Sequence, residues 1–69
     1  MDFKWEDGFV IAVSAGNGSV TITANKEGLR SLASHLIALS EEKAGSHFHL
    51  DRHNSLEDDS ADLIIEKIE

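Results

Sequence analysis

The sequence predicts one small α+β domain over residues 1–69, a two-layer sandwich with one helix on one face of an antiparallel sheet. Two stretches with strand alternation flank a Gly-rich turn, a stretch with helical periodicity follows, and two apolar segments complete the chain. The order β-β-α-β-β gives a sheet of four strands, or five if Phe3 and Trp5 belong to a further strand. A chain of this length has room for one small core.

The first two strands are predicted on either side of the turn AGNG, residues 15–18. Apolar and polar residues alternate in residues 9–14 and again in residues 20–24, which is the period of a half-buried strand. Gly and Asn tolerate positive φ, so the turn can be tight and the strands antiparallel. The side chains expected to face the helix are Ile11, Val13, Val20 and Ile22.

The periodicity changes after Asn25 and predicts an amphipathic helix over residues 26–43. Asn25 suits the N-cap, and Lys43 followed by Gly45 suits the last turn and the exit. Gly28 costs on the order of 1 kcal/mol in helix propensity unless it permits close approach to the sheet. The stripe that should face the core, with Leu32 and Leu36 buried, consists of Leu29, Leu32, Ala33, Leu36 and Leu39.

The last two strands are predicted in SHFHLD, residues 46–51, and in ADLIIEKI, residues 61–68. Successive strand side chains alternate between faces. If Phe48, Leu50, Leu63 and Ile65 face the helix, the opposite side of the sheet carries His47, His49 and Asp51.

The polar residues His47, His49 and Asp51 have three interpretations: the solvent-exposed face of a sheet with no further role, a site for a divalent ion, or part of a protein-binding surface. Imidazole and carboxylate are ligands that zinc accepts, but alternate strand side chains lie some 6–7 Å apart, so the spacing is weakly specific. We favour the solvent-exposed face with no further role and predict no metal site. His35 is expected at the boundary of the helix stripe and His53 in a loop.

Composition argues against several functional classes. The sequence has no nucleophile elbow, no Gly-rich phosphate loop and no second layer to close a cleft, so we predict a protein that is not an enzyme and has no cofactor. The chain has no cysteine, so its stability must come from packing, or from packing plus association as a homodimer.

The net charge of −7 is unevenly distributed, with −1 in residues 1–40 and −6 in residues 41–69. An acidic half of this kind repels nucleic acid and anionic membranes and favours a basic partner. No segment approaches the ~20 apolar residues of a membrane span, and the N-terminus lacks the features of a signal peptide, so we expect a cytoplasmic location.

The loop of residues 54–60 is long for a hairpin connection and places Leu56 before three consecutive acids. Either Leu56 plugs the open end of the sandwich, or it is the apolar anchor of a recognition loop with a charged rim. The candidate partner-binding residues are His47, His49, Asp51, Asn54, Leu56, Glu57, Asp58 and Asp59.

Residues 25–68 resemble the bacterial immunity protein 32 family. The shared pattern comprises an N-x-x-G-L-x-x-L-A-x-x-L helix, a G-S-H-x-H-x-D strand, an N-S-L-E loop and an S-x-x-L-I-I-E ending. The matching residues are Asn25, Gly28, Leu29, Leu32, Ala33, Leu36, Gly45, Ser46, His47, His49, Asp51, Asn54, Ser55, Leu56, Glu57, Ser60, Leu63, Ile64, Ile65 and Glu66.

The resemblance implies a small α+β antidote from a polymorphic toxin locus, which binds a cognate toxin and blocks it by direct protein contact. An acidic surface would suit a toxin with a basic nuclease domain, because complementary fields speed association. The alternative from a different class is a small non-enzymatic metal-binding or regulatory module that uses the strand face of His47, His49 and Asp51.

Overall fold

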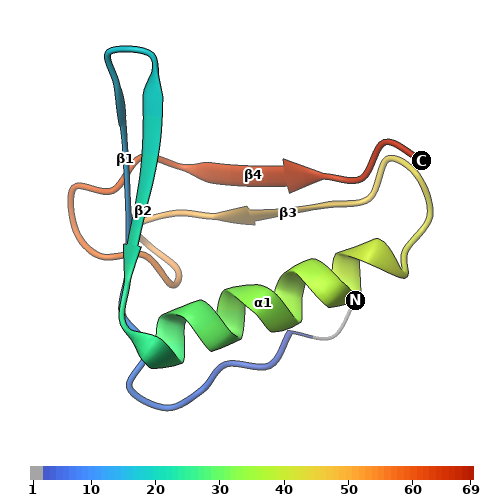
Figure 1. Ribbon diagram of the computed structural model, residues 1–69, viewed down its shortest axis with the longest axis horizontal. Helices are drawn as coiled ribbons and strands as arrows, with labels where there is room; N and C mark the ends of the chain where they lie inside the picture. The colour runs from blue at the N-terminus through green and yellow to red at the C-terminus, as the bar shows by residue number, and fades with distance from the viewer. Residues whose placement is uncertain (1–2) are drawn as a thin grey trace.

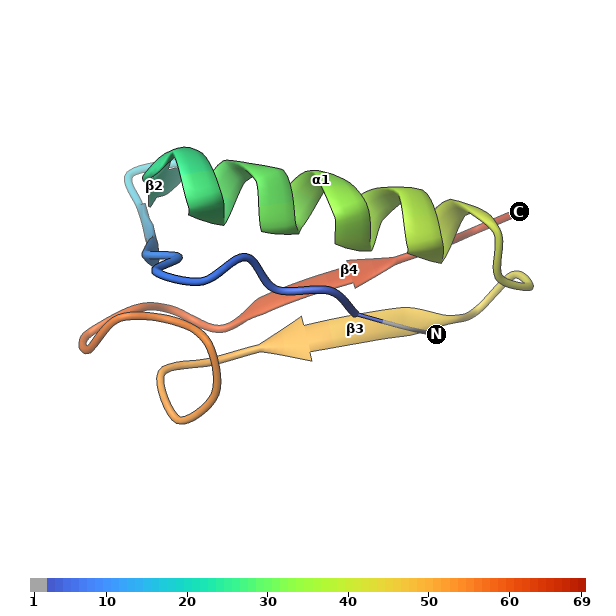
Figure 2. The same cartoon turned by 90° about the horizontal axis from the view of Figure 1, so that it is seen from below.

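The computed structural model describes residues 3–69 and has the predicted element order β-β-α-β-β. The elements are β1 (Ile11–Gly16), β2 (Ser19–Ala24), α1 (Lys26–Ser40), β3 (His47–Leu50) and β4 (Leu63–Glu66). α1 covers one face of the β3–β4 hairpin, and the β1–β2 hairpin runs across the end of both layers with its tip beyond β4 (Figure 1; Figure 2).

The first hairpin has the tight turn that the sequence predicted. Asn17 and Gly18 form its two central residues with φ of 54° and 78°, a left-handed conformation that Asn and Gly adopt more readily than other residues. The flanking residues Gly16 and Ser19 are paired, and the ladder continues to Ile11 opposite Ala24.

The predicted single sheet is wrong, because the four strands form two separate two-stranded sheets, β1–β2 and β3–β4. The backbone N–H and C=O groups of β1 that point away from β2 bind a loop instead of a third strand. The carbonyl oxygens of Ile11 and Val13 accept hydrogen bonds from Glu57 N and Ala61 N at 2.9 and 2.8 Å. Val13 N in turn donates to Ser60 Oγ at 3.1 Å. These bonds use the strand edge through which the hairpins would have had to join.

The division into two sheets changes which apolar residues reach the core. Only the base of the first hairpin does so, because its tip extends past the helix and the second hairpin (Figure 1). Four residues that were expected to meet across the helix and sheet are exposed: Val20, Ile22, Leu29 and Leu36. The buried apolar core consists of Ile11, Val13, Leu32, Leu39, Phe48, Leu50 and Leu56.

α1 begins as predicted and ends earlier than predicted. The Asn25 side chain accepts a hydrogen bond from Gly28 N at 2.8 Å, which is an N-cap interaction. The helix ends at Ser40 and not at residue 43. Its last turn has no basic residue, and the cation comes from after β4, where Lys67 Nζ donates to the carbonyl oxygens of Ser40 and Glu42 at 2.8 and 2.6 Å. Lys67 thereby satisfies carbonyl groups at the negative end of the helix dipole.

Gly28 permits close contact between α1 and the first hairpin, one of the two roles that we considered for it. A Cβ atom there would lie 2.5 Å from Val10 O and 2.9 Å from Ile11 Cγ1. Real side chains do not reach such distances, so the helix would have to move away from the hairpin.

The optional fifth strand is absent from the described residues, and the segment before β1 runs along α1 as irregular chain (Figure 2). Glu6 N donates to the buried Ser31 Oγ at 2.9 Å, which fixes the segment to the helix. Trp5 stacks on Phe9, and Phe3 contacts Phe48 edge-on. The segment therefore contributes aromatic side chains to the core without contributing a strand.

His35 is fully buried in this aromatic layer, and the boundary position predicted for it is wrong. Its ring lies 4.6 Å from Phe3, 4.2 Å from Trp5 and 5.8 Å from Phe48, centroid to centroid. Neither ring nitrogen has a hydrogen-bond partner within residues 3–69. Burial lowers the pKa of His35 below its ordinary value. His35 therefore acts as a neutral core aromatic.

Candidate functional site

The β3–β4 hairpin presents an exposed face on the side away from α1. His47 and His49 are exposed and alternate with buried residues of β3, so their predicted orientation is confirmed. The register places His47 opposite Glu66 and His49 opposite Ile64. Directly opposed residues share a face of the sheet. We call the resulting surface the outer face, and it consists of His47, His49, Ile64 and Glu66.

Ile64 is the residue of this face that the sequence reasoning missed. Its side chain is 59% exposed, among two histidines and a glutamate. The signal was present in the alternation of β4, because assigning Leu63 and Ile65 to the core leaves Ile64 on the opposite side. An apolar residue with a polar rim is an arrangement common in protein interfaces.

The outer face continues into residues 51–62, which we call the acidic loop. His49 Nε2 lies 3.2 Å from Asp62 Oδ2, so the last acid of the loop lies beside β3. Both side chains are substantially exposed, and an exposed pair of this kind adds little stability. The contact therefore orients groups on the surface and is not a source of fold stability.

Asp51 has a structural role at the start of the acidic loop. Its Oδ1 atom accepts hydrogen bonds from His53 N at 2.9 Å and from Asn54 N at 3.0 Å, and its carbonyl oxygen accepts one from Leu56 N at 3.0 Å. This is the turn chemistry in which an Asp side chain satisfies the backbone just after it. The carboxylate is thus directed at the loop, and no group of three or more metal-ligating side chains is found among residues 3–69.

Leu56 is buried, with 5% of its surface exposed, and belongs to the apolar core. This position agrees with the first of our two interpretations, in which Leu56 plugs the open end of the domain. The neighbouring residue Glu57 donates its backbone N–H to Ile11 O, which places the loop along β1. Leu56 therefore holds the acidic loop in place and is not accessible as an anchor in this conformation.

The acids after Leu56 are exposed on the loop that it anchors. Asp58 and Asp59 line a shallow depression together with Arg52 and His53. Asp59 has a φ of 67° and Ser55 a φ of 84°, so two non-glycine residues of the loop are in the left-handed region. The remaining candidate, Asn54, is exposed and bridges to Asp51 through the backbone.

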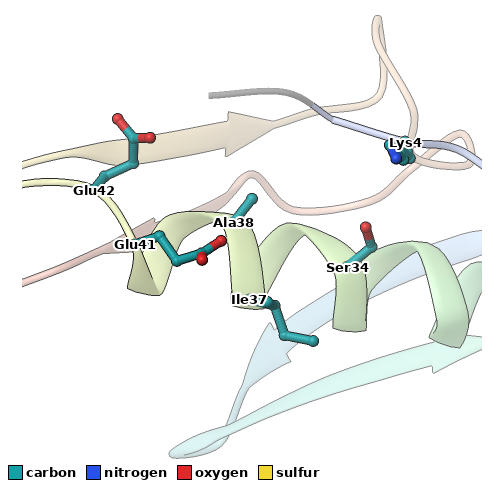
Figure 3. A pocket seen from close by; sticks show the side chains of 6 residues that line it. All are labelled: Lys4, Ser34, Ile37, Ala38, Glu41 and Glu42. Atoms are coloured by element: carbon teal, nitrogen blue, oxygen red, sulfur yellow. The ribbon is translucent and has the colours of Figure 1, made fainter.

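A second shallow depression lies between the N-terminal segment and the last turns of α1 (Figure 3). Lys4 and Ser34 lie near one end of it, and Glu41 and Glu42 at the helix terminus (Figure 3). The other residues that line the depression are Ile37 and Ala38.

No helix within residues 3–69 is long and apolar enough to cross a membrane. The search of curated proteins found no significant match, and the search of solved structures found none either. The family profile described as immunity protein 32 matches residues 19–68, which span β2, α1, β3, the acidic loop and β4. A match over most of the sequence, including all of the outer face and the acidic loop, shows that the chain belongs to the immunity protein 32 family.

Proposed function

We propose that this protein is an antidote that binds a cognate bacterial toxin and blocks it by direct contact, without catalysis. The observation that carries the proposal is the match to the immunity protein family over residues 19–68. Family membership implies a toxin as the partner, and the proposed contact lies on the outer face and the adjoining acidic loop.

The chemistry of this surface supports a basic partner. Asp58 and Asp59 are exposed at the loop, and Asp62 and Glu66 extend the negative charge toward the outer face. A toxin that binds nucleic acid needs a basic site, so an acidic antidote would be drawn to it by long-range attraction. We therefore propose a nuclease domain as the toxin class.

Ile64 replaces Leu56 as the proposed anchor. Leu56 is in the core, whereas Ile64 is exposed on the outer face beside His49. In protein interfaces an apolar anchor mainly lowers the dissociation rate, while charges at the rim mainly raise the association rate. His47 and His49 would then contribute polar contacts around the anchor.

The test is a kinetic binding assay with the toxic domain encoded by the neighbouring gene. We expect Ile64→Ser to increase the dissociation rate by on the order of tenfold, because it removes the anchor. Ile37→Ser is the matched control, since Ile37 is similarly exposed on α1, away from the outer face, and should leave the kinetics unchanged.

Neutralising the loop acids tests the charge contribution separately. The double change Asp58→Asn and Asp59→Asn should slow association and flatten its salt dependence. The double change Glu41→Gln and Glu42→Gln removes the same charge at the far end of α1 and should have a smaller effect (Figure 1). Equal effects of both pairs would place the contact elsewhere, and no binding by the wild-type protein would contradict the antidote function.

The metal-binding alternative has less support than the antidote, because Asp51 Oδ1 accepts hydrogen bonds from backbone N–H groups of its own loop. The cytoplasmic location stays a prediction from the sequence.

A further inference from the structure

β2 is an exposed edge strand without any charge. Five of its six residues are exposed, and Val20 and Ile22 have 68% and 41% of their surface accessible. Residues 9–25 contain no Asp, Glu, Lys, Arg or His, although 28% of the whole chain is charged. Natural edge strands usually carry a charge, a proline or a cover that prevents pairing with another strand. β2 has neither charge nor proline.

The hairpin register decides which backbone groups of β2 are free. In a two-residue hairpin the pair that flanks the turn is hydrogen-bonded, and bonded pairs alternate with non-bonded pairs along the ladder. Asn25 N donates to Val10 O at 3.1 Å, which agrees with this series. The N–H and C=O groups of Val20 and Ile22 therefore point away from β1, toward the open side.

The other strand edges differ from β2. The outer edge of β1 is bonded to the acidic loop through Glu57 and Ala61. β4 has four residues where β2 has six, and acids at Asp62 and Glu66 and a cation at Lys67 lie in or beside it. β2 is thus the longest uncovered and uncharged strand edge in the described part of the chain.

We propose that β2 is the contact surface of a homodimer, in which two copies pair antiparallel through this strand and form a four-stranded sheet, β1–β2–β2–β1. Two copies of −7 repel each other, and this repulsion is smallest where they meet through the uncharged hairpin, residues 9–25. The same uncharged strand offers a basic partner no electrostatic attraction, so the strand suits a second copy better than it suits a basic partner.

The position of the free backbone groups along β2 also supports a second copy as the partner. The outward groups belong to residues of even number, so a bonded antiparallel pair joins Val20 or Ile22 to an even-numbered residue of the second copy. Opposed residues then share a face, and the exposed apolar side chains of both copies lie on the same side of the new sheet. A two-fold axis across β2 produces this pairing from one self-complementary strand.

Sedimentation analysis over a wide concentration range tests the proposal. We expect the wild-type protein to dimerise, and Val20→Lys to weaken dimerisation by on the order of tenfold or more, because each copy would bring an ammonium group into the uncharged contact. Ile37→Lys is the matched control, a similarly exposed apolar residue of α1, and should not change the dimer constant. A monomeric wild-type protein at every concentration, or equal weakening by both variants, would overturn the proposal.

Amide hydrogen exchange of the wild-type protein gives a test that needs no variant. Thr21 N–H is bonded to β1 in the monomer and should be protected at every concentration. Val20 and Ile22 N–H should become protected only as the protein concentration rises. If their exchange stays independent of concentration while the protein sediments as a dimer, the dimer uses another surface.

Salt distinguishes the homodimer from the toxin complex. Screening reduces the repulsion between two acidic copies, so added salt should strengthen the homodimer. The same salt should weaken an acidic antidote bound to a basic toxin. Because the toxin contact is proposed on the outer face and acidic loop, failure of either proposal leaves the other standing.

Discussion

The two hairpins share one motif and differ in charge, turn and edge. The β1–β2 hairpin has six-residue strands, a two-residue turn and no charged residue. The β3–β4 hairpin has four-residue strands, and the acidic loop of residues 51–62 connects them. Of the two hairpins, only β3–β4 contains charged residues, and this difference is the basis for proposing a basic partner for β3–β4 and a second copy for β1–β2.

The acidic loop joins the two hairpins physically. It leaves β3 at Asp51, places Leu56 in the core, bonds to β1 through Glu57 and Ala61, and returns to β4. The loop thereby replaces the missing contact between the two sheets.

Leu56→Ala should have the largest effect, because it empties a core position that ties the acidic loop to both hairpins. We expect a loss of about 2–5 kcal/mol in the free energy of unfolding, measured by urea denaturation. Leu29→Ala, at an exposed helix position, should cost much less. A similar loss in both variants would show that Leu56 is not more buried than Leu29 in solution.

Gly28→Ala should separate α1 from the first hairpin. The added Cβ would meet the backbone oxygen of Val10, which cannot move alone, and we expect a loss of about 1–3 kcal/mol despite the better helix propensity of Ala. Gly16→Ala is the control, since no atom beyond Gly16 and its two chain neighbours lies within 4 Å of its Cβ position. Urea denaturation of both variants measures the difference, and a stabilised Gly28→Ala protein would contradict the close contact.

His35 tests how the second hairpin is packed, through the pH dependence of stability. Burial lowers the folded-state pKa of His35 below 6.5, so the unfolded chain binds the proton more tightly. The contribution of neutral His35 to the free energy of unfolding is therefore fully present above about pH 6.5. This contribution falls as the pH decreases toward the folded-state pKa, by at most about 1.4 kcal/mol per pH unit.

His35→Phe should remove this part of the pH dependence, because the aromatic packing stays and the titrating group is lost. Urea denaturation at about pH 7.5 and pH 5.5 measures it. His53→Gln, at an exposed loop residue, should keep the wild-type slope. An unchanged slope in His35→Phe would mean that the ring is not buried in the neutral form.

Local patterns in the sequence determined the elements of this fold. Asn17-Gly18 set the turn, Asn25 set the helix start, and the alternation of β3 set which side His47 and His49 occupy. These features depend on backbone preferences and side-chain periods within a few residues, so they can be read without knowing the rest of the chain. The family pattern in residues 25–68 likewise indicates an immunity protein from the sequence alone.

The tertiary structure decided how those elements meet. Either a strand or a loop can form hydrogen bonds with the backbone groups of β1 that point away from β2. No local pattern in the sequence showed that residues 57–61 would form them. That choice divided the sheet, left Val20 and Leu36 exposed, and placed Leu56 in the core. The cap from Lys67 to the end of α1 and the burial of His35 have the same origin, because each depends on contacts between residues far apart in the sequence.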